Sequence, residues 1–143
     1  MKSMMLKMSV VVLSVMTMVG CASTPANDGP SDEELVTAVV TSIADALKAG
    51  DVEKMVSHFS EDFSSDEGGT KEATKEFMMG AKAAGYLDGI EVDLSTMKVE
   101  IEKGDEKASA GPIDLEGAFG ALSLDYELEK RDGKWIAVYM SQY

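Results

Sequence analysis

The chain has 143 residues, enough for one domain, and its 13 lysine and arginine residues against 26 aspartate and glutamate residues give a net charge of −13. A field of that sign repels nucleic acid and anionic lipid headgroups, which excludes a role in binding DNA or RNA. The hydrophobic content of 45% is enough for a packed core, and the single cysteine, Cys21, excludes an internal disulfide and a cysteine-cluster metal site.

The first twenty residues are typical of an export signal. Lys2 and Lys7 give this segment a positively charged start, and residues 8–19 form an apolar stretch that only Ser and Thr interrupt. About twelve residues are too few to cross a bilayer as a helix, which needs roughly 20, but they suit the apolar region of a signal peptide. We therefore expect residues 1–20 to be removed from the mature chain.

The residues that end this segment, Met18-Val19-Gly20-Cys21, resemble the bacterial lipobox, although that pattern usually has Leu at the position of Met18. The resemblance implies cleavage after Gly20, attachment of a diacylglycerol to the Cys21 thiol and acylation of the new amino group, so that palmitate-type chains anchor the protein in a membrane. Ala22 follows the cysteine, which by the same resemblance implies the periplasmic face of the outer membrane in a Gram-negative host. The alternative is an ordinary secretory signal with a coincidental cysteine.

A short tether separates this anchor from the rest of the chain. Residues 21–30 contain two prolines and a glycine and show no apolar periodicity, which predicts a flexible linker. Ser31 and Glu34 then form a capping box, the usual signature of a helix start. We therefore expect a single domain over residues 31–143.

Three helices are predicted at the start of this domain, each from apolar residues at helical spacing. The first begins at Ser31 and ends at Gly50, the second begins at Asp51, and the third runs from Thr70 to Gly85. The apolar face of the first consists of Leu35, Val36, Val39, Val40, Ile43 and Leu47. The apolar faces of the second and third consist of Val52, Met55, Val56 and Phe59, and of Ala73, Phe77, Ala81 and Ala84.

After Gly89 the apolar period changes from 3.6 to 2, which predicts strands. The expected strands are, in chain order, 90–94, 97–101, 108–115, 122–129 and 135–140. The parity of the alternation switches at Ser95-Thr96, which requires a β-bulge or a break, and Gly111-Pro112 requires a kink or an edge position. Asp132-Gly133 is a strong hairpin signal, and the last strand is apolar on both faces, as a central strand would be.

Two segments resemble the nuclear transport factor 2-like (SnoaL-like, ketosteroid-isomerase-like) superfamily: residues 49–63, AGDVEKMVSHFSEDF, and residues 128–135, LEKRDGKW. The resemblance extends over residues 31–143. It implies an α+β fold in which three N-terminal helices pack on a curved antiparallel sheet, forming a cone with a pocket at its open end. It implies no single activity, because the superfamily includes isomerases, dehydratases and non-enzymatic modules.

An isomerase- or dehydratase-type enzyme is one hypothesis that this resemblance raises. Asp66 or Glu67 registers with the family's general base, and His58, the only histidine, would assist it. The family's tyrosine donor aligns with Ile43, which cannot donate a hydrogen bond, and Asp125, which registers with the second acid, has the parity of solvent-facing residues. The alternatives are a plain surface loop for Asp66 and Glu67 and a partly exposed boundary position for His58.

The favoured hypothesis is a binding role without catalysis, either for a small apolar molecule in the cone or for a protein partner on the open sheet face. A third possibility is a purely structural envelope protein, which predicts a filled core with no pocket. A homodimer through that sheet is implied by the resemblance alone. The aromatic residues that would line an apolar pocket, or equally form the core, are Phe77, Tyr86, Phe119, Tyr126, Trp135 and Tyr139. Phe119 lies between small residues, where it would cover the cone or contact a partner. We expect no metal site and no cofactor.

Overall fold

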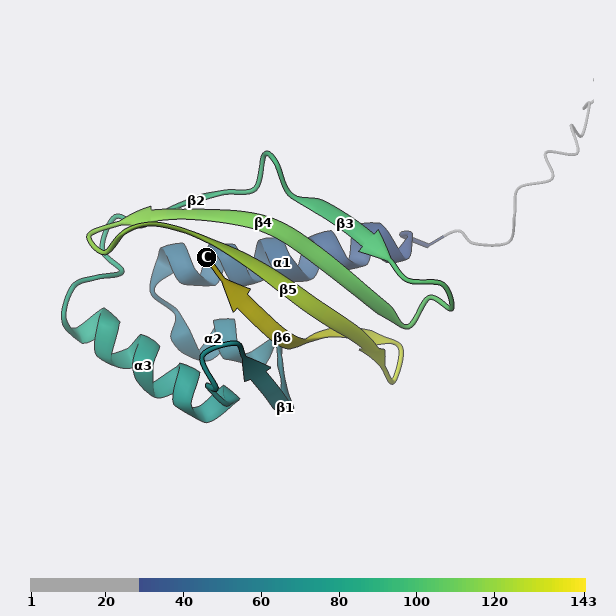
Figure 1. The fold of residues 1–143 in the computed structure, drawn as a ribbon, viewed down its shortest axis with the longest axis horizontal. Helices are drawn as coiled ribbons and strands as arrows, with labels where there is room; N and C mark the ends of the chain where they lie inside the picture. The colour runs from purple at the N-terminus through teal and green to yellow at the C-terminus, as the bar shows by residue number, and fades with distance from the viewer. Residues whose placement is uncertain (1–28) are drawn as a thin grey trace, which may run out of the picture.

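The computed structural model describes residues 29–143; the predicted signal segment, its lipobox with Cys21 and most of the tether lie outside these residues. The described part forms three helices and a six-stranded sheet (Figure 1). The strand order is β1-β6-β5-β4-β2, and β3 also pairs with β4. In Figure 1 α1 runs behind β4 and β5 and α3 lies at the lower left, so one sheet face is covered by α1 and the other faces outward, as expected for an α+β layout.

The first helix, α1 (Asp32–Ala49), begins and ends at the predicted residues. The Glu34 N–H donates to Ser31 Oγ (3.2 Å), and the Ser31 N–H donates to Glu34 Oε2 (2.7 Å), which confirms the capping box. The helix ends at Gly50, whose φ of 67° lies in the left-handed region that glycine favours. The buried side chains of α1 are Val36, Val40, Ile43, Ala44, Ala46 and Leu47.

The second helix, α2 (Val52–Ser57), is shorter than predicted, because Phe59 leaves the helix and begins strand β1 (Phe59–Ser65). β1 pairs in parallel with β6 (Lys134–Gln142), and Phe59 lies opposite Ala137. The sheet is therefore mixed rather than wholly antiparallel. The sequence of β1, FSEDFSS, does not alternate between apolar and polar residues, so it carries no strand pattern. Ser60, a polar residue, is buried together with Phe59 and Phe63.

The third helix, α3 (Lys71–Ala83), forms as predicted, but most of the predicted buried stripe is wrong. Ala73, Phe77 and Ala84 are exposed, and Phe77 is 73% exposed. Of the predicted stripe Ala81 packs against the core, and Met78, which was not predicted, packs beside it. Two lysine–glutamate ion pairs connect the helix to β1 and α2, so the face that turns inward is set by charge as well as by apolar contact.

The two strands that follow are separate, as the parity switch predicts. β2 (Glu91–Asp93) and β3 (Lys98–Ile101) both pair antiparallel with β4 (Lys107–Gly117). In the turn between them the Ser95 N–H donates to Asp93 Oδ1 (2.8 Å). The break lets Val92 and Val99 both face the core although their sequence parity differs.

The remaining strands form a meander. β5 (Gly120–Arg131) pairs antiparallel with β4 and with β6, and Asp132-Gly133 makes the predicted tight turn with φ values of 52° and 75°. The register shifts at Gly111-Pro112, where the kink was expected. A Cβ on Gly111 would overlap the Asp125 carboxylate, so any other residue there requires Asp125 to move. β6 lies between β1 and β5, the central position predicted for it.

Candidate functional site

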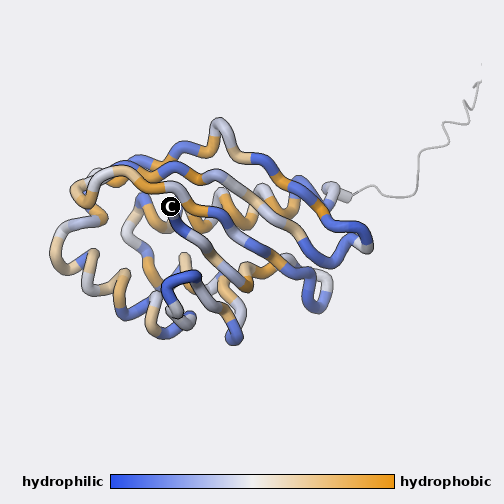
Figure 2. The backbone as a smooth tube through the Cα atoms, in the orientation of Figure 1, coloured by the Kyte–Doolittle hydropathy of each residue, from blue (hydrophilic) through white to orange (hydrophobic). Residues whose placement is uncertain are grey.

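The space between the helices and the sheet is filled with side chains. Phe59 and Phe63 of β1 stack with their ring centroids 4.2 Å apart, and the Tyr126 ring of β5 lies 6.0 Å from Phe59. All three are buried, and this burial raises the pKa of the Tyr126 phenol. Figure 2 shows hydrophobic and hydrophilic positions alternating along β4 and β5, which directs one set of side chains into this core. In the described part of the chain the interior is a packed core.

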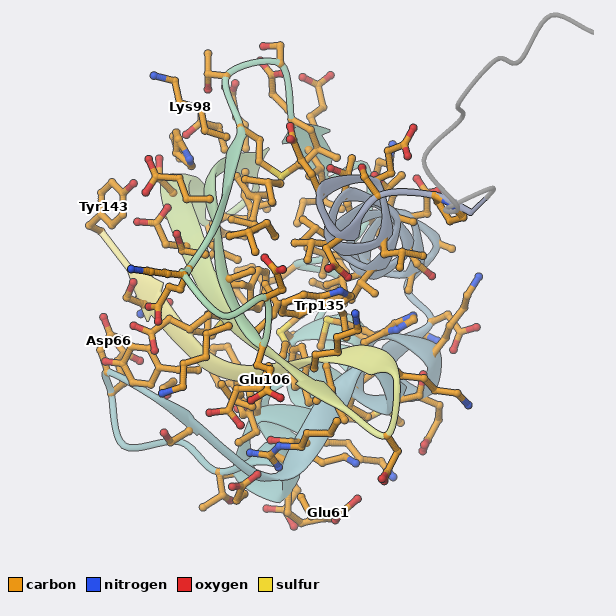
Figure 3. The ribbon with its side chains drawn as sticks, turned by 90° about the vertical axis from the view of Figure 1, so that its right-hand side faces the viewer. Glu61, Asp66, Lys98, Glu106, Trp135 and Tyr143 are labelled. Carbon is orange, nitrogen blue, oxygen red and sulfur yellow. The ribbon has the colours of Figure 1, made fainter. Side chains whose placement is uncertain are left out.

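The acidic residues of the enzymatic hypothesis lie in an exposed loop after β1. The Asp66 N–H donates to the Met140 carbonyl (3.1 Å), and Asp66 Oδ2 accepts a hydrogen bond from the Gln142 N–H (3.0 Å). Glu67 is exposed beside it. Figure 3 shows Asp66 at the outside of the molecule, away from Trp135 in the interior. Asp66 therefore holds the loop against the end of β6.

His58 lies at the other end of β1. Its Nε2 is 2.9 Å from Ser42 Oγ of α1, and burial, with a smaller effect of the nearby Lys54 charge, lowers the pKa of the imidazole. The His58 carbonyl accepts a hydrogen bond from the Ala137 N–H (2.9 Å), whereas Asp66 contacts Met140 and Gln142, so the two residues lie beside different positions of β6. The structure does not bring the proposed base and its assisting group together.

The six predicted pocket-lining aromatic residues fall into two sets. Tyr126 and Trp135 are buried in the core, whereas Phe77 and Tyr86 are exposed and Tyr139 is half-buried on the outward side, opposite Glu127. Phe119 lies in the β4–β5 turn and is 40% exposed, and its ring rests on Gly117 of the same turn. The ring covers its own hairpin, and these aromatic residues do not line one common cavity.

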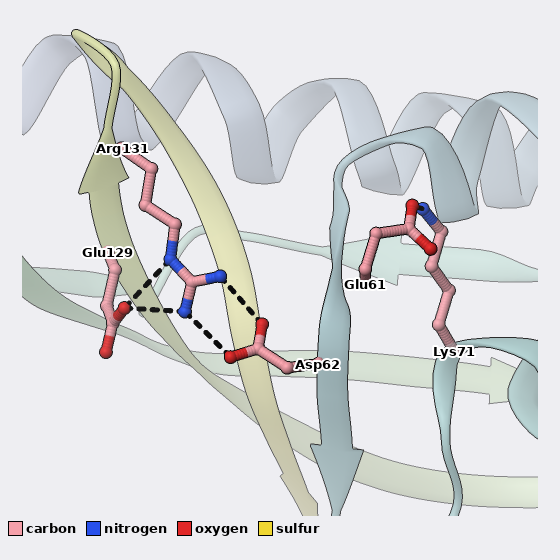
Figure 4. A network of polar contacts seen from close by, with 5 residues as sticks. All are labelled: Glu61, Asp62, Lys71, Glu129 and Arg131. Carbon is pink, nitrogen blue, oxygen red and sulfur yellow. Dashed lines mark hydrogen bonds and ion pairs between the residues drawn. The ribbon is translucent and has the colours of Figure 1, made fainter.

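Arg131 joins two strands through a pair of carboxylates (Figure 4). Its guanidinium donates to both Asp62 oxygens (2.7 and 3.1 Å) and to Glu129 Oε2 (2.8 and 3.0 Å). The hydrogen bonds from Arg131 hold the pKa of Asp62 well below its ordinary range. This arrangement connects β1 with the β5–β6 hairpin, and we interpret it as structural.

A second polar cluster fixes the start of the domain. Asp32 Oδ1 accepts hydrogen bonds from Lys130 Nζ (2.9 Å) and Trp135 Nε1 (3.0 Å), and Lys130 Nζ lies 5.9 Å from the Trp135 ring centroid. The hydrogen bond from Lys130 lowers the pKa of Asp32 most, and the hydrogen bond from Trp135 lowers it further. The first residue of α1 is therefore attached to the β5–β6 hairpin. Sequence reasoning assigned Trp135 to the lining of a pocket or to the core, and it missed this contact.

The outward face of the sheet has a hollow of about 390 Å³ over β2, β4 and β5. Its carboxylates face one another across strands: Glu91 lies opposite Glu116, and Asp93 lies opposite Asp114. Like charges placed opposite each other on neighbouring strands destabilise a sheet. Ser123 Oγ donates to Asp114 Oδ1 (2.5 Å), which relieves part of that charge.

Tyr143 closes one side of this hollow and is 69% exposed. Its hydroxyl donates to Asp125 Oδ1 (3.4 Å), and desolvation together with the Asp125 charge raises the pKa of the phenol. The backbone of Tyr143 pairs with that of Ser123, which places the ring at the sheet surface (Figure 3). Sequence analysis missed this residue, because nothing local shows that the chain's last residue pairs with β5.

A groove of about 530 Å³ lies between α1 and the β2–β3 edge. One wall consists of Glu33, Thr37 and Thr41, which recur every four residues along α1. The opposite wall consists of Leu94, Met97, Lys98, Val99 and Glu100. The groove is open to solvent along its length.

No protein-family model matches the sequence, and no curated protein matches it significantly. Solved structures match the fold. An NTF2-like protein of unknown function from Shewanella baltica OS155 superposes with a TM-score of 0.62 at 17% identity, over 77% of this chain and 90% of that one. The domain has the NTF2-like fold.

Two further structures support that assignment. An NTF2-like protein with a cystatin-like fold from Novosphingobium aromaticivorans gives a TM-score of 0.60 at 15% identity, over 78% of this chain and 80% of that one. A candidate scytalone dehydratase from N. aromaticivorans DSM 12444 gives a TM-score of 0.63 at 15% identity, over 76% of this chain and 80% of that one. At these identities the likeness concerns the fold of the NTF2-like domain and not its activity.

Within residues 29–143, no three His, Asp or Glu side chains are arranged to hold a metal ion. No helix of the same residues is long and apolar enough to cross a membrane. On its outside the described part of the chain has one hollow on the sheet face and one groove beside α1.

Proposed function

We propose that the chain is a lipid-anchored envelope protein, attached through Cys21, whose NTF2-like domain binds a protein partner on the outward sheet face without catalysis. The packed interior supports a binding surface over an internal ligand site, because Phe59, Phe63 and Tyr126 occupy the space that a small apolar molecule would need. General acid–base catalysis requires groups within hydrogen-bond reach of one substrate, and the side chains of Asp66 and His58 contact different parts of the chain, Gln142 and Ser42.

The outward face supports a partner that contributes a cationic extended segment. The pairs Glu91–Glu116 and Asp93–Asp114 repel each other in the free protein, so lysine or arginine side chains laid across them would relieve the repulsion. The Tyr143 ring beside them offers the aromatic contact that protein interfaces favour. A second copy of the same face would instead oppose like charges, which disfavours a homodimer through the sheet face.

A peptide titration tests this surface. The probe is a synthetic ten-residue peptide of alternating lysine and threonine, added to ¹⁵N-labelled domain, and its fully lysine-acetylated form is the control. We expect amide shifts at β2, β4 and β5 that weaken with salt, because exposed charges are screened at about 8 Å in physiological buffer. Shifts spread evenly over the acidic surface would contradict a defined site.

A matched pair of double variants separates this site from net charge. Asp114→Asn with Glu116→Gln removes two charges from the hollow, and Glu102→Gln with Glu106→Gln removes two exposed charges at the β3–β4 turn. We expect the first pair to weaken peptide binding about tenfold and the second less than twofold, since only the first lies opposite other carboxylates. Equal weakening by both pairs would contradict the proposal.

The anchor is tested separately. Mass spectrometry of the amino-terminal peptide from envelope fractions should find a chain that begins at Cys21 and carries acyl groups, and in a Gram-negative host it should fractionate with the outer membrane. Cys21→Ser should abolish the acylated species, because thioether attachment needs the thiol. A mature chain that starts elsewhere and is released into the soluble fraction would contradict the anchor.

A further inference from the structure

Strand β3 forms a free edge of the sheet, along the upper border in Figure 1. It pairs only with β4, in a register that sets Val99 opposite Ala110. The Glu102 N–H donates to the Lys107 carbonyl (2.8 Å), so the alternation of an antiparallel ladder also points the backbone groups of Lys98 and Glu100 at β4. The N–H and C=O groups of Val99 and Ile101 therefore point away from β4, and no strand within residues 29–143 pairs with them.

The side chains of this edge carry opposite charges on one face. Lys98 and Glu100 are exposed on the outward side, and neither forms an ion pair with any residue that the structure describes. Figure 3 shows Lys98 extending away from the body of the molecule. Val99 and Ile101 turn inward and pack against the core. The edge thus combines free backbone groups with one positive and one negative side chain two residues apart.

We propose that β3 pairs with β3 of a second copy of this chain, antiparallel about a twofold axis perpendicular to the sheet. With Val99 opposite its mate, Lys98 of each copy faces Glu100 of the other, which gives two attractive cross-strand pairs. The neighbouring register, with Val99 opposite Ile101, would set Lys98 against Glu102 but also Glu100 against Glu100, a repulsion that the first register lacks. Charge therefore selects the first register among those that the free backbone groups permit.

The edge suits a second copy better than the outward face does. On the face, the carboxylates of β2 and β4 would meet carboxylates of the second copy, whereas the edge is complementary to itself. The groove between α1 and the β2–β3 edge is bordered by Met97 and Val99, so the second β3 would cover its open side. This self-pairing is independent of the partner proposed for the sheet face.

Cross-linking of the full chain tests the register. Unlabelled and ¹⁵N-labelled full chains are mixed and treated with a carbodiimide, which joins a lysine to a carboxylate in direct contact. We expect a product in which Lys98 of one isotope form is joined to Glu100 of the other. If the mixed product is absent, or if the two copies are joined only through other residues, the proposal is overturned.

Charge reversal tests the energetics, with the dissociation constant measured by sedimentation equilibrium and the fold checked by Trp135 fluorescence. Lys98→Glu makes both cross-strand pairs repulsive and should raise the dissociation constant about tenfold. Lys98→Glu combined with Glu100→Lys restores both attractions and should return the constant to near the original value. Lys103→Glu, the same change of charge at the exposed β3–β4 turn, should leave it unchanged. A double variant as weak as Lys98→Glu would overturn the proposal.

Discussion

Removal of the Phe63 ring is the sharpest test of the packed interior. Phe63 is 2% exposed and stacks on Phe59 at 4.2 Å. Replacing a fully buried phenylalanine by alanine costs about 3–5 kcal/mol, the sum of lost apolar transfer and the cavity left behind. A domain of this size has a total stability of about 5–15 kcal/mol, so Phe63→Ala should still fold at 25 °C.

The corresponding fall in melting temperature follows from the size of the domain. For about 115 residues, each kcal/mol corresponds to roughly 4 °C, so Phe63→Ala should melt about 12–20 °C below the unaltered protein. Urea unfolding followed by the fluorescence of Trp135 measures the free energy directly, because Trp135 is the only tryptophan and is buried.

Phe77→Ala provides the matched control, since the same substitution is made at a ring that is 73% exposed. Phe77→Ala should change the free energy of unfolding by less than about 0.5 kcal/mol. Similar losses from the two variants, or a loss below about 1 kcal/mol for Phe63→Ala, would refute the packing described for β1. Such a result would mean that the space behind the sheet is loosely filled and open to a ligand.

Two further predictions concern glycine and pH. Gly111→Ala should lower the free energy of unfolding by about 1–3 kcal/mol, because the new Cβ would meet Asp125. Gly80→Ala in α3, where a Cβ meets no other atom, should raise the free energy of unfolding by about 0.5–1 kcal/mol. Thermal melting of the two variants checks both signs. Because burial lowers the folded-state pKa of His58 below its unfolded value near 6.5, the unfolded state binds more protons in this range, and stability should fall as the pH drops below about 6.5 toward the folded-state pKa. His58→Gln should flatten that fall in urea titrations above pH 5, and an unchanged slope would contradict the burial described.

The features that sequence predicts well are those set by residues close together in the chain. The capping box of Ser31 and Glu34, the left-handed Gly50 and the Asp132-Gly133 turn each depend on a few adjacent residues. The break between β2 and β3 follows from a parity switch that is visible in the sequence, and the kink at Gly111-Pro112 follows from the residue types. Together with the superfamily resemblance, these were enough for the fold.

The features that sequence misses depend on partners far along the chain. β1 becomes a strand because β6, some 70 residues later, pairs with it, and its own residues show no strand pattern. In α3, apolar residues lie on two sides, and periodicity alone does not show that Met78 rather than Phe77 turns inward. The candidate site has the same origin, since Tyr143 joins the hollow only through its pairing with Ser123.

Native mass spectrometry of the purified domain, residues 29–143, tests the central claim most directly. If the interior is a packed core and binding occurs on outer surfaces, the spectrum should show only whole-number multiples of the polypeptide mass. A retained small apolar molecule that is released when the domain unfolds would contradict the account, because the interior described here has no room for it.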